Sequence, residues 1–125
     1  MEWYLAAMNK YADFSGRARR QEYWMYTLVY MVIYVVPYVI SIEAKGSVRL
    51  MFGILTFLIA LFHLLPGLAV GVRRLHDTGK SAWWLFISFV PIVGAIILLV
   101  FLCSDSDSFP NEYGPSPKAP AYAVR

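Results

Sequence analysis

The sequence is poor in charge and in cysteine. Charged residues make up only 15% of its 125 residues and hydrophobic residues make up 59%, whereas soluble domains carry about 25% charged residues. A soluble fold of this size buries only about two thirds of the surface of its unfolded chain, which is too little to hide so much apolar surface. Cys103 is the single cysteine, which excludes an internal disulfide and a cysteine-rich metal cluster. The composition therefore predicts a protein of the lipid bilayer.

Long uncharged stretches support that prediction. Residues 23–42, 50–72 and 82–103 contain no Asp, Glu, Lys or Arg, and about 20 helical residues cross a hydrocarbon core of about 30 Å. We therefore expect an all-α, polytopic integral membrane protein with three transmembrane helices in one membrane domain, residues 1–103. The remaining residues, 104–125, are polar and rich in proline, and we expect this tail to be extended or disordered.

An amphipathic helix is predicted ahead of the first span, over residues 3–14. At about 3.6 residues per turn, its aromatic and apolar side chains share one face and its polar side chains share the other. The apolar face consists of Trp3, Tyr4, Ala7, Met8, Tyr11 and Phe14. Such a helix lies either in the membrane interface, with the aromatic face toward lipid, or on the cytoplasmic surface of the protein itself. The sequence leaves both alternatives open.

Lysine and arginine are distributed unevenly between the two sides of the predicted spans. Seven lie in the N-terminal segment and the loop before the third span, and four lie in the first loop and the tail. The positive-inside rule therefore predicts a cytoplasmic N-terminus and a tail on the opposite side. Pro91 and Gly94 predict a kink in the third span. If the chain turns back there as a re-entrant hairpin, the tail returns to the cytoplasm.

Five arginines gather where the first two spans meet the membrane surface. They are Arg17, Arg19, Arg20, Arg73 and Arg74. Guanidinium groups bind phosphate through paired hydrogen bonds, so this cluster predicts a binding site for an anion or a lipid headgroup. The alternative is topogenic: the arginines orient the protein and tie the helix ends together through Glu22, His76 and Asp77 as partners in a charge network.

Catalytic chemistry finds little support in the sequence. His76 next to Asp77 suggests a general base with its orienting carboxylate, but adjacent side chains on a helix point about 100° apart. Neither a serine nor a cysteine motif lies nearby, and the spacing of His63 and His76 matches no zinc pattern. We therefore expect a non-enzymatic protein without catalytic residues, cofactor or metal. The basic residues adjoin membrane spans, so nucleic acid is not an expected partner.

Polar groups inside the spans offer a second functional candidate. His63 lies within the second span, and a row of tyrosines, which includes Tyr30 and Tyr34, runs along the first. Ionisable groups at membrane depth are candidates for function because lipid solvates them poorly. One alternative is therefore an oligomeric transporter or channel component with its pathway near these residues. The other is a neutral histidine that is hydrogen-bonded to a tyrosine of the first span.

The second span also contains Gly67 and Gly71 in G-x-x-x-G spacing. Small residues at this spacing let helices approach closely, either within one chain or between copies. A homo-oligomer or a larger membrane complex is therefore an expected assembly, together with anionic membrane lipids as partners. Taken together, the residues favour a small non-enzymatic membrane protein that binds anionic lipid or a membrane partner through a cytoplasmic arginine cluster.

Three separated motifs resemble a known family. They are FSGRARRQEYW over 14–24, RRLHDTG over 73–79 followed by Trp83 and Trp84, and NEYG over 111–114. In this order they resemble the bacterial inner-membrane family catalogued as domain of unknown function 805. The resemblance implies a bacterial inner membrane location and a compact helical bundle. It implies no activity, because the family itself has none assigned.

Overall fold

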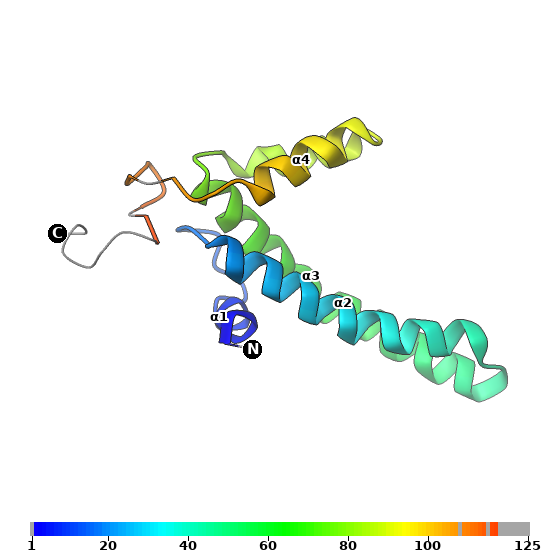
Figure 1. The fold of residues 1–125 in the computed structure, drawn as a ribbon. Helices are drawn as coiled ribbons and strands as arrows, with labels where there is room; N and C mark the ends of the chain where they lie inside the picture. Colours follow the sequence, from blue (N-terminus) through cyan, green and yellow to red (C-terminus); the bar gives the residue numbers. More distant parts are fainter. Residues whose placement is uncertain (1, 108, 115, 118–125) are drawn as a thin grey trace.

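The regular elements of the protein are helices. The computed structural model describes residues 2–107, 109–114 and 116–117. In chain order the elements are α1 (Glu2–Asn9), α2 (Arg20–Glu43), α3 (Gly46–Asp77), the 3-10 helix η1 (Ala82–Phe89) and α4 (Val93–Cys103) (Figure 1). The described residues form one long helical hairpin with the shorter elements gathered at one of its ends, rather than the compact bundle that the resemblance implies.

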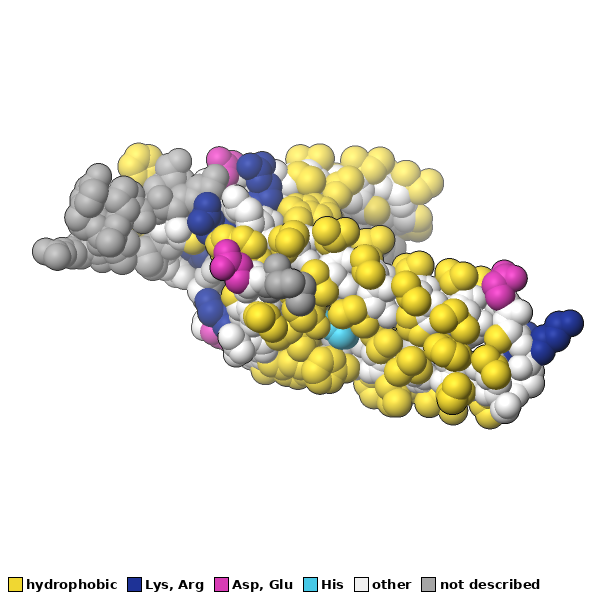
Figure 2. All heavy atoms as spheres, turned by 60° about the horizontal axis from the view of Figure 1, so that its bottom comes forward, with side chains coloured by type: hydrophobic (Ala, Val, Ile, Leu, Met, Phe, Trp, Pro, Cys, Tyr) yellow, Lys and Arg dark blue, Asp and Glu magenta, His cyan; other side chains and the backbone are white. Residues whose placement is uncertain are grey.

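Helices α2 and α3 form the long antiparallel hairpin and contain the first two predicted spans, 23–42 and 50–72. Both are long and apolar enough to cross a membrane, and only 11% of the most apolar window of each is buried. A core helix of a soluble protein would bury most of that window, so this exposure fits lipid as the surrounding solvent. Figure 2 shows hydrophobic side chains over the length of the hairpin and charged side chains toward its ends.

The prediction of one continuous third span over 82–103 is wrong. Helix η1 ends at Phe89 and α4 runs back from Val93, so both legs of this second hairpin share the end of the molecule where α3 finishes (Figure 1). Pro91 disfavours helix in the preceding residue and lacks an amide hydrogen, and Ile92 adopts a φ of 65°. Each leg is about 16 Å long, too short to cross a core of about 30 Å.

A glycine lets the two legs of the η1–α4 hairpin pack closely. A Cβ atom on Gly94 would lie 1.7 Å from the carbonyl oxygen of Ile87, so no other residue fits this backbone. The uncharged length of 82–103 is thus divided between two short helices. Among the described residues, two helices are long and apolar enough to span a membrane, and the third apolar stretch forms a short hairpin.

The tail is ordered over its described residues, against our expectation of an extended or disordered segment over 104–125. It turns back across the end of α3, where the amide of Asp107 donates to the carbonyl of Asp77 at 2.8 Å, and a bridge pairs Asn111 with Gly114. Residues 118–125 lie outside the described residues. The tail therefore shares one end of the molecule with the N-terminal segment, as in the re-entrant alternative and against a tail on the opposite side.

Helix α1 packs on the protein itself. It is shorter than the predicted 3–14 because the chain turns after Asn9. Ala7 is fully buried and forms a small core with Ala18, Tyr26 and Val70. Figure 1 shows α1 end-on beside α2 and α3, so it crosses both. The apolar face of this amphipathic helix thus packs against α2 and α3.

Candidate functional site

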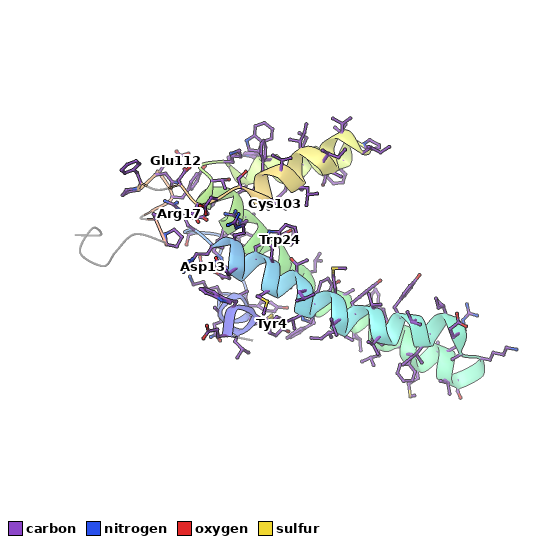
Figure 3. All side chains as sticks on the ribbon, in the orientation of Figure 1. Tyr4, Asp13, Arg17, Trp24, Cys103 and Glu112 are labelled. Atoms are coloured by element: carbon purple, nitrogen blue, oxygen red, sulfur yellow. The ribbon has the colours of Figure 1, made fainter. Side chains whose placement is uncertain are left out.

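The candidate site lies at the polar end of the molecule, where the N-terminal segment, the start of α2, the ends of α3 and α4, and the tail meet. Figure 3 shows Arg17, Trp24 and Cys103 at this end. We call its buried charged group the arginine network, and its members are Arg17, Glu22, Arg73, Arg74 and Asp77. The sequence predicted all five as site residues, and the structure brings them together.

Asp77 is the centre of the arginine network. Its two carboxylate oxygens accept hydrogen bonds from different arginines, from Nε of Arg17 at 3.0 Å and from Nη1 of Arg74 at 2.8 Å. The hydroxyl of Ser106 donates to the same carboxylate. The Asp77 and Arg74 side chains are 0% exposed. Two guanidinium groups on one fully buried carboxylate are required here, because an unpaired buried charge strongly destabilises a fold.

A second ion pair joins α2 to α3. Nη1 of Arg73 lies 2.6 Å from a carboxylate oxygen of Glu22, and its Nε donates to the carbonyl of Asp13 at 3.1 Å. Nη2 of Arg73 is buried without a partner among the described atoms. Hydrogen bonds from Ser15 hold the pKa of the Asp13 carboxyl below its usual range. The N-terminal segment is thereby fixed against the end of α3.

The carbonyls at the end of α3 are satisfied by other segments. The last turn of a helix leaves its carbonyls without helical partners and carries partial negative charge. The carbonyl of Asp77 accepts from Nη2 of Arg17 at 3.0 Å and from the amide of Asp107 at 2.8 Å. The carbonyl of His76 accepts from Nδ2 of Asn111 at 3.0 Å. The N-terminal segment and the tail thus cap α3 together.

The end of α4 is fastened in the same manner. The carbonyl of Leu102 accepts from Nε of Arg74 at 3.0 Å and from Nε1 of Trp24 at 3.3 Å, and the carbonyl of Cys103 accepts from Nη1 of Arg20 at 3.1 Å. Arg74 also donates to the carbonyl of Ser104. One arginine therefore links α3, the carboxylate of Asp77 and the base of the η1–α4 hairpin.

The tail surrounds the guanidinium of Arg17. Nη1 donates to the carbonyls of Phe109 and Gly114 at 3.1 and 3.3 Å, and Nη2 donates to the carbonyl of Asp107 at 2.8 Å. The Arg17 side chain is only 2% exposed. Sequence reasoning missed these tail residues as part of the site, although the NEYG motif was a signal for them. Arg17, Arg73 and Arg74 therefore bind protein groups.

His76 and Asp77 have separate partners. Nδ1 of His76 lies 3.1 Å from the carbonyl oxygen of Gly16, and its ring stacks on that of Tyr113 with centroids 3.8 Å apart and planes at 2°. Burial raises the pKa of the Tyr113 hydroxyl. The imidazole thus connects the N-terminal segment to the tail, and the adjacent carboxylate belongs to the arginines.

Two of the five predicted arginines stand apart from the ion pairs. Arg20 is exposed, and Arg19 is partly exposed with its guanidinium carbon 5.5 Å from the ring centroid of Trp3. Nε of Arg19 is buried and has no hydrogen-bond partner among the described atoms, so only the outer part of this side chain reaches the surface. Both residues begin α2 at the polar end. The predicted cluster is therefore divided into three interior arginines and two surface arginines.

His63 lies away from the network, among the aromatic rings of α1 and α2. Its Nδ1 lies 2.9 Å from the carbonyl oxygen of Ile59 and its Nε2 lies 2.9 Å from the hydroxyl of Tyr4. Because a carbonyl only accepts, Nδ1 carries a proton, and Nε2 shares its hydrogen bond with the Tyr4 hydroxyl. The predicted partner was a tyrosine of the first span. The partner is instead Tyr4 of α1, while Tyr30 of that span stacks on the ring at 4.9 Å.

The tyrosine row of α2 is packed ring against ring. The Tyr30 and Tyr34 centroids are 5.8 Å apart, and Tyr26 donates to the backbone carbonyl of His63 at 2.9 Å. Gly67 leaves room for that hydroxyl, since a Cβ there would lie 3.4 Å from it. Gly71 faces a different element, with Leu85 of η1 3.8 Å from its would-be Cβ. The two glycines thus serve contacts within the chain.

A metal site is not evident in the described part of the chain, where no group of three or more His, Cys, Asp or Glu side chains could hold an ion. An apolar groove of about 460 Å³ separates α3 from η1, with Leu68, Val72 and Phe86 among its lining residues. A cavity of about 410 Å³ at the opposite end is lined by residues such as Leu50 and Phe57. His63 lines neither of them.

Comparison with known proteins places the chain in a family of membrane proteins. The family described as "Protein of unknown function (DUF805)" matches residues 11–115. The chain is 43% identical over 118 residues to inner membrane protein YhaI of Escherichia coli strain K12, which covers 94% of this chain and 97% of that protein. It is 40% identical over 122 residues to inner membrane protein YhaH of the same strain, which covers 94% of this chain and 98% of that protein.

No solved structure matches the chain at a significant level. The family match includes every residue of the arginine network and the tail segment around Arg17. Both relatives are inner membrane proteins by name and are matched over almost their whole length. The chain therefore belongs to the DUF805 family of proteins of unknown function and is a multi-pass protein of the bacterial inner membrane.

Proposed function

We propose that this protein is a non-enzymatic membrane module that binds the headgroup of an anionic phospholipid with Arg19 and Arg20 at the cytoplasmic surface. The observation that carries the proposal is the division of the five arginines. Arg17, Arg73 and Arg74 are buried and bonded to carboxylates and carbonyls of the chain itself. The two that begin α2 remain at the surface.

The position of these two arginines suits a phosphate at the membrane surface. Guanidinium groups form paired hydrogen bonds with phosphate oxygens, which favours arginine over lysine at such sites. The Trp3 ring lies against Arg19, and tryptophan is enriched at headgroup depth. Arg20 uses Nη1 for the carbonyl of Cys103 and is otherwise exposed. At the start of α2, the Arg20 guanidinium is thereby held beside the end of α4, and the Arg19 guanidinium is held beside α1.

The fold also sharpens the charge asymmetry that orients the protein. With the tail at the same end as the N-terminal segment, the opposite end of the described chain keeps only Lys45 and Arg49. Seven basic residues lie at the polar end of the described chain: Lys10, Arg17, Arg19, Arg20, Arg73, Arg74 and Lys80. The positive-inside rule therefore favours a cytoplasmic polar end, where anionic lipid attracts basic groups.

Native mass spectrometry of protein released gently from its membrane tests the proposal, because it counts retained lipids directly. We expect Arg19→Gln/Arg20→Gln to lower retained phosphatidylglycerol and cardiolipin severalfold. The matched control is Lys45→Gln/Arg49→Gln, which removes the same charge from exposed residues at the opposite end and should leave retention unchanged. Equal retention in both variants would contradict the proposal, provided that both unfold at the same temperature as the natural chain.

A further inference from the structure

The two halves of the α2–α3 hairpin carry very different amounts of protein. Helix α1 lies beside the half near the polar end, where Tyr4 bonds to His63 at 2.9 Å and Tyr11 donates to the carbonyl of Phe62 at 2.7 Å. The η1–α4 hairpin starts at the same end, from its base beside Arg74, and diverges at an angle from the long α2–α3 hairpin (Figure 1). Around the other half, the described chain contributes α2 and α3 alone.

The η1–α4 hairpin has the depth of a single leaflet. Its base is fixed at the polar end, because Arg74 bonds to Leu102 and Arg20 bonds to Cys103. From there each leg runs for about 16 Å, which is about half of a hydrocarbon core of about 30 Å. Trp83, near the base, suits the interface where tryptophans gather. The turn at Ile92 therefore lies near the middle of the bilayer or short of it.

The η1–α4 hairpin exposes apolar side chains on all its faces. Residues 82–103 contain no charged side chain, and in α4 only Gly94 and Leu102 are buried. Phe89 and Ile92 near the turn are 78% and 76% exposed. A helix that is apolar on every side belongs in a protein core or in a membrane, and this hairpin is not in the core of its own chain, whereas a helix that docks on a protein surface shows one apolar face. The apolar groove between α3 and η1 is open to the same lipid.

We infer that this protein is a one-leaflet wedge, which prefers bilayers curved so that the leaflet around α1 and the η1–α4 hairpin is the convex one. In the described chain, α1 and the η1–α4 hairpin would add their volume to α2 and α3 in that leaflet, whereas the other leaflet would hold α2 and α3 alone. Extra area in one leaflet relieves the packing stress of a convex surface, and interfacial insertions are curvature-sensitive for that reason. The ligand is thus a curved lipid surface, recognised by shape and apolar burial. The inference does not depend on headgroup binding by Arg19 and Arg20.

Single-vesicle fluorescence on neutral phosphatidylcholine tests the wedge without any contribution from anionic lipid. The full chain carries Cys103→Ser and Ser47→Cys, with one dye at the connection between α2 and α3. A membrane-impermeant quencher added outside reaches the dye only if the α2–α3 connection faces outward. Because the η1–α4 hairpin lies at the other end, a quenched dye places that hairpin in the inner leaflet. With the η1–α4 hairpin in the outer leaflet, we expect the number of protein molecules per unit of membrane area to rise severalfold from large to small vesicles. With the hairpin in the inner leaflet, the trend should reverse. Equal protein densities at all vesicle sizes would overturn the inference. So would a density that falls toward small vesicles when the η1–α4 hairpin is in the outer leaflet and rises when it is in the inner leaflet.

A variant pair separates the hairpin from the rest of the fold. Phe89→Asn/Ile92→Asn places polar groups where acyl chains would be, and both side chains are exposed, so internal packing is kept. Phe89→Leu/Ile92→Val is the matched apolar control. We expect the size dependence to fall in the asparagine pair and to persist in the control. Equal size dependence in both pairs would contradict a wedge made by the hairpin.

The competing occupant of the apolar hairpin is another protein or a second copy. A nitroxide on Ile92→Cys, in a Cys103→Ser chain, reports which one is present. Accessibility to oxygen but not to a water-soluble nickel complex, with no spin–spin broadening, supports acyl chains. Broadening between copies, or protection from both reagents, would show that protein covers the hairpin and would overturn the inference.

Discussion

The half of the molecule at the polar end and the half around the α2–α3 connection are held together in different ways. At the polar end, Arg74 and Asp77 are 0% exposed and join α3, α4, the N-terminal segment and the tail. In the opposite half, hydroxyls such as that of Thr56 bond within their own helix, and Leu50 is 66% exposed. One half is fixed by directional bonds between segments, and the other presents apolar side chains to lipid.

That difference teaches how a small membrane protein becomes specific. Lipid chains are as apolar as leucine, so contact between two apolar helices gains little hydrophobic free energy in a bilayer. Two long apolar helices therefore need few contacts with each other to remain in the membrane. Short elements such as the η1–α4 hairpin need bonds to fix their position, and arginine supplies several donors in a rigid fork. The arginine network is placed where those elements begin and end.

The largest expected effect comes from removing the carboxylate at the centre of the network. Asp77→Ala leaves Arg17 and Arg74 buried without their counter-charge, and breaking a buried pair in this way costs about 3–5 kcal/mol. The free energy of unfolding, measured by denaturant titration in detergent, should fall by that amount. Glu43→Ala, at an exposed residue near the α2–α3 connection, is the control and should change it little. Equal losses in both variants would erase the contrast between the two halves.

A smaller effect is expected from filling the glycine position inside the η1–α4 hairpin. A Cβ on Gly94 would lie 1.7 Å from the backbone oxygen of Ile87, so Gly94→Ala should open the hairpin and lower stability by about 1–3 kcal/mol or more. Gly53 of α3 has open space around it. Gly53→Ala should therefore be neutral or stabilise the helix by up to about 1 kcal/mol. Denaturant titration compares the two, and a stable Gly94→Ala variant would show that the legs are not packed as described.

The smallest effect is local and concerns the tail. Gly79 has a φ of 78°, and a Cβ there would lie 2.7 Å from a carboxylate oxygen of Asp107, whereas Gly46 has a φ of 62° with open space. Alanine at either position carries the strain of a positive φ, about 1 kcal/mol. Only Gly79→Ala should also displace the tail, which limited proteolysis after residue 103 would detect as faster cleavage. Equal cleavage rates in the two variants would place the tail away from Gly79.

The spans could be predicted from the sequence because the requirement is one of length and polarity. Residues 23–42 and 50–72 lie within α2 and α3, since uncharged stretches of that length fit a bilayer and little else. The same argument failed for 82–103, because apolar length alone does not distinguish one span from two half-length legs. Pro91 and Gly94 were the local signal, and the close backbone contact at Gly94 made the turn.

The chemistry of the site was predictable from residue types, but its partners were not. The arginines and Asp77 stand close in sequence to the ends of the spans, so a charge network could be expected there. The groups that complete it come from Phe109, Gly114 and the backbone of α4, which are separated from Arg17 by most of the chain. Composition alone predicts disorder for a polar, proline-rich segment. It does not show that the backbone carbonyls of this segment accept hydrogen bonds from a buried guanidinium group.

The sequence by itself determined that this protein belongs in a membrane, that its two long helices cross it, and that basic groups collect at one end. Those properties depend on the free energy of transfer into lipid and on helix length. Both quantities add up residue by residue, so they can be calculated without knowing any tertiary contact. Only the tertiary structure decided that the third apolar stretch folds back, that three arginines lie inside and two outside, and that Tyr4 rather than a tyrosine of α2 bonds to the imidazole of His63. Those properties depend on the geometry of pairs distant in sequence, because a buried charge or donor requires a partner at one place in space.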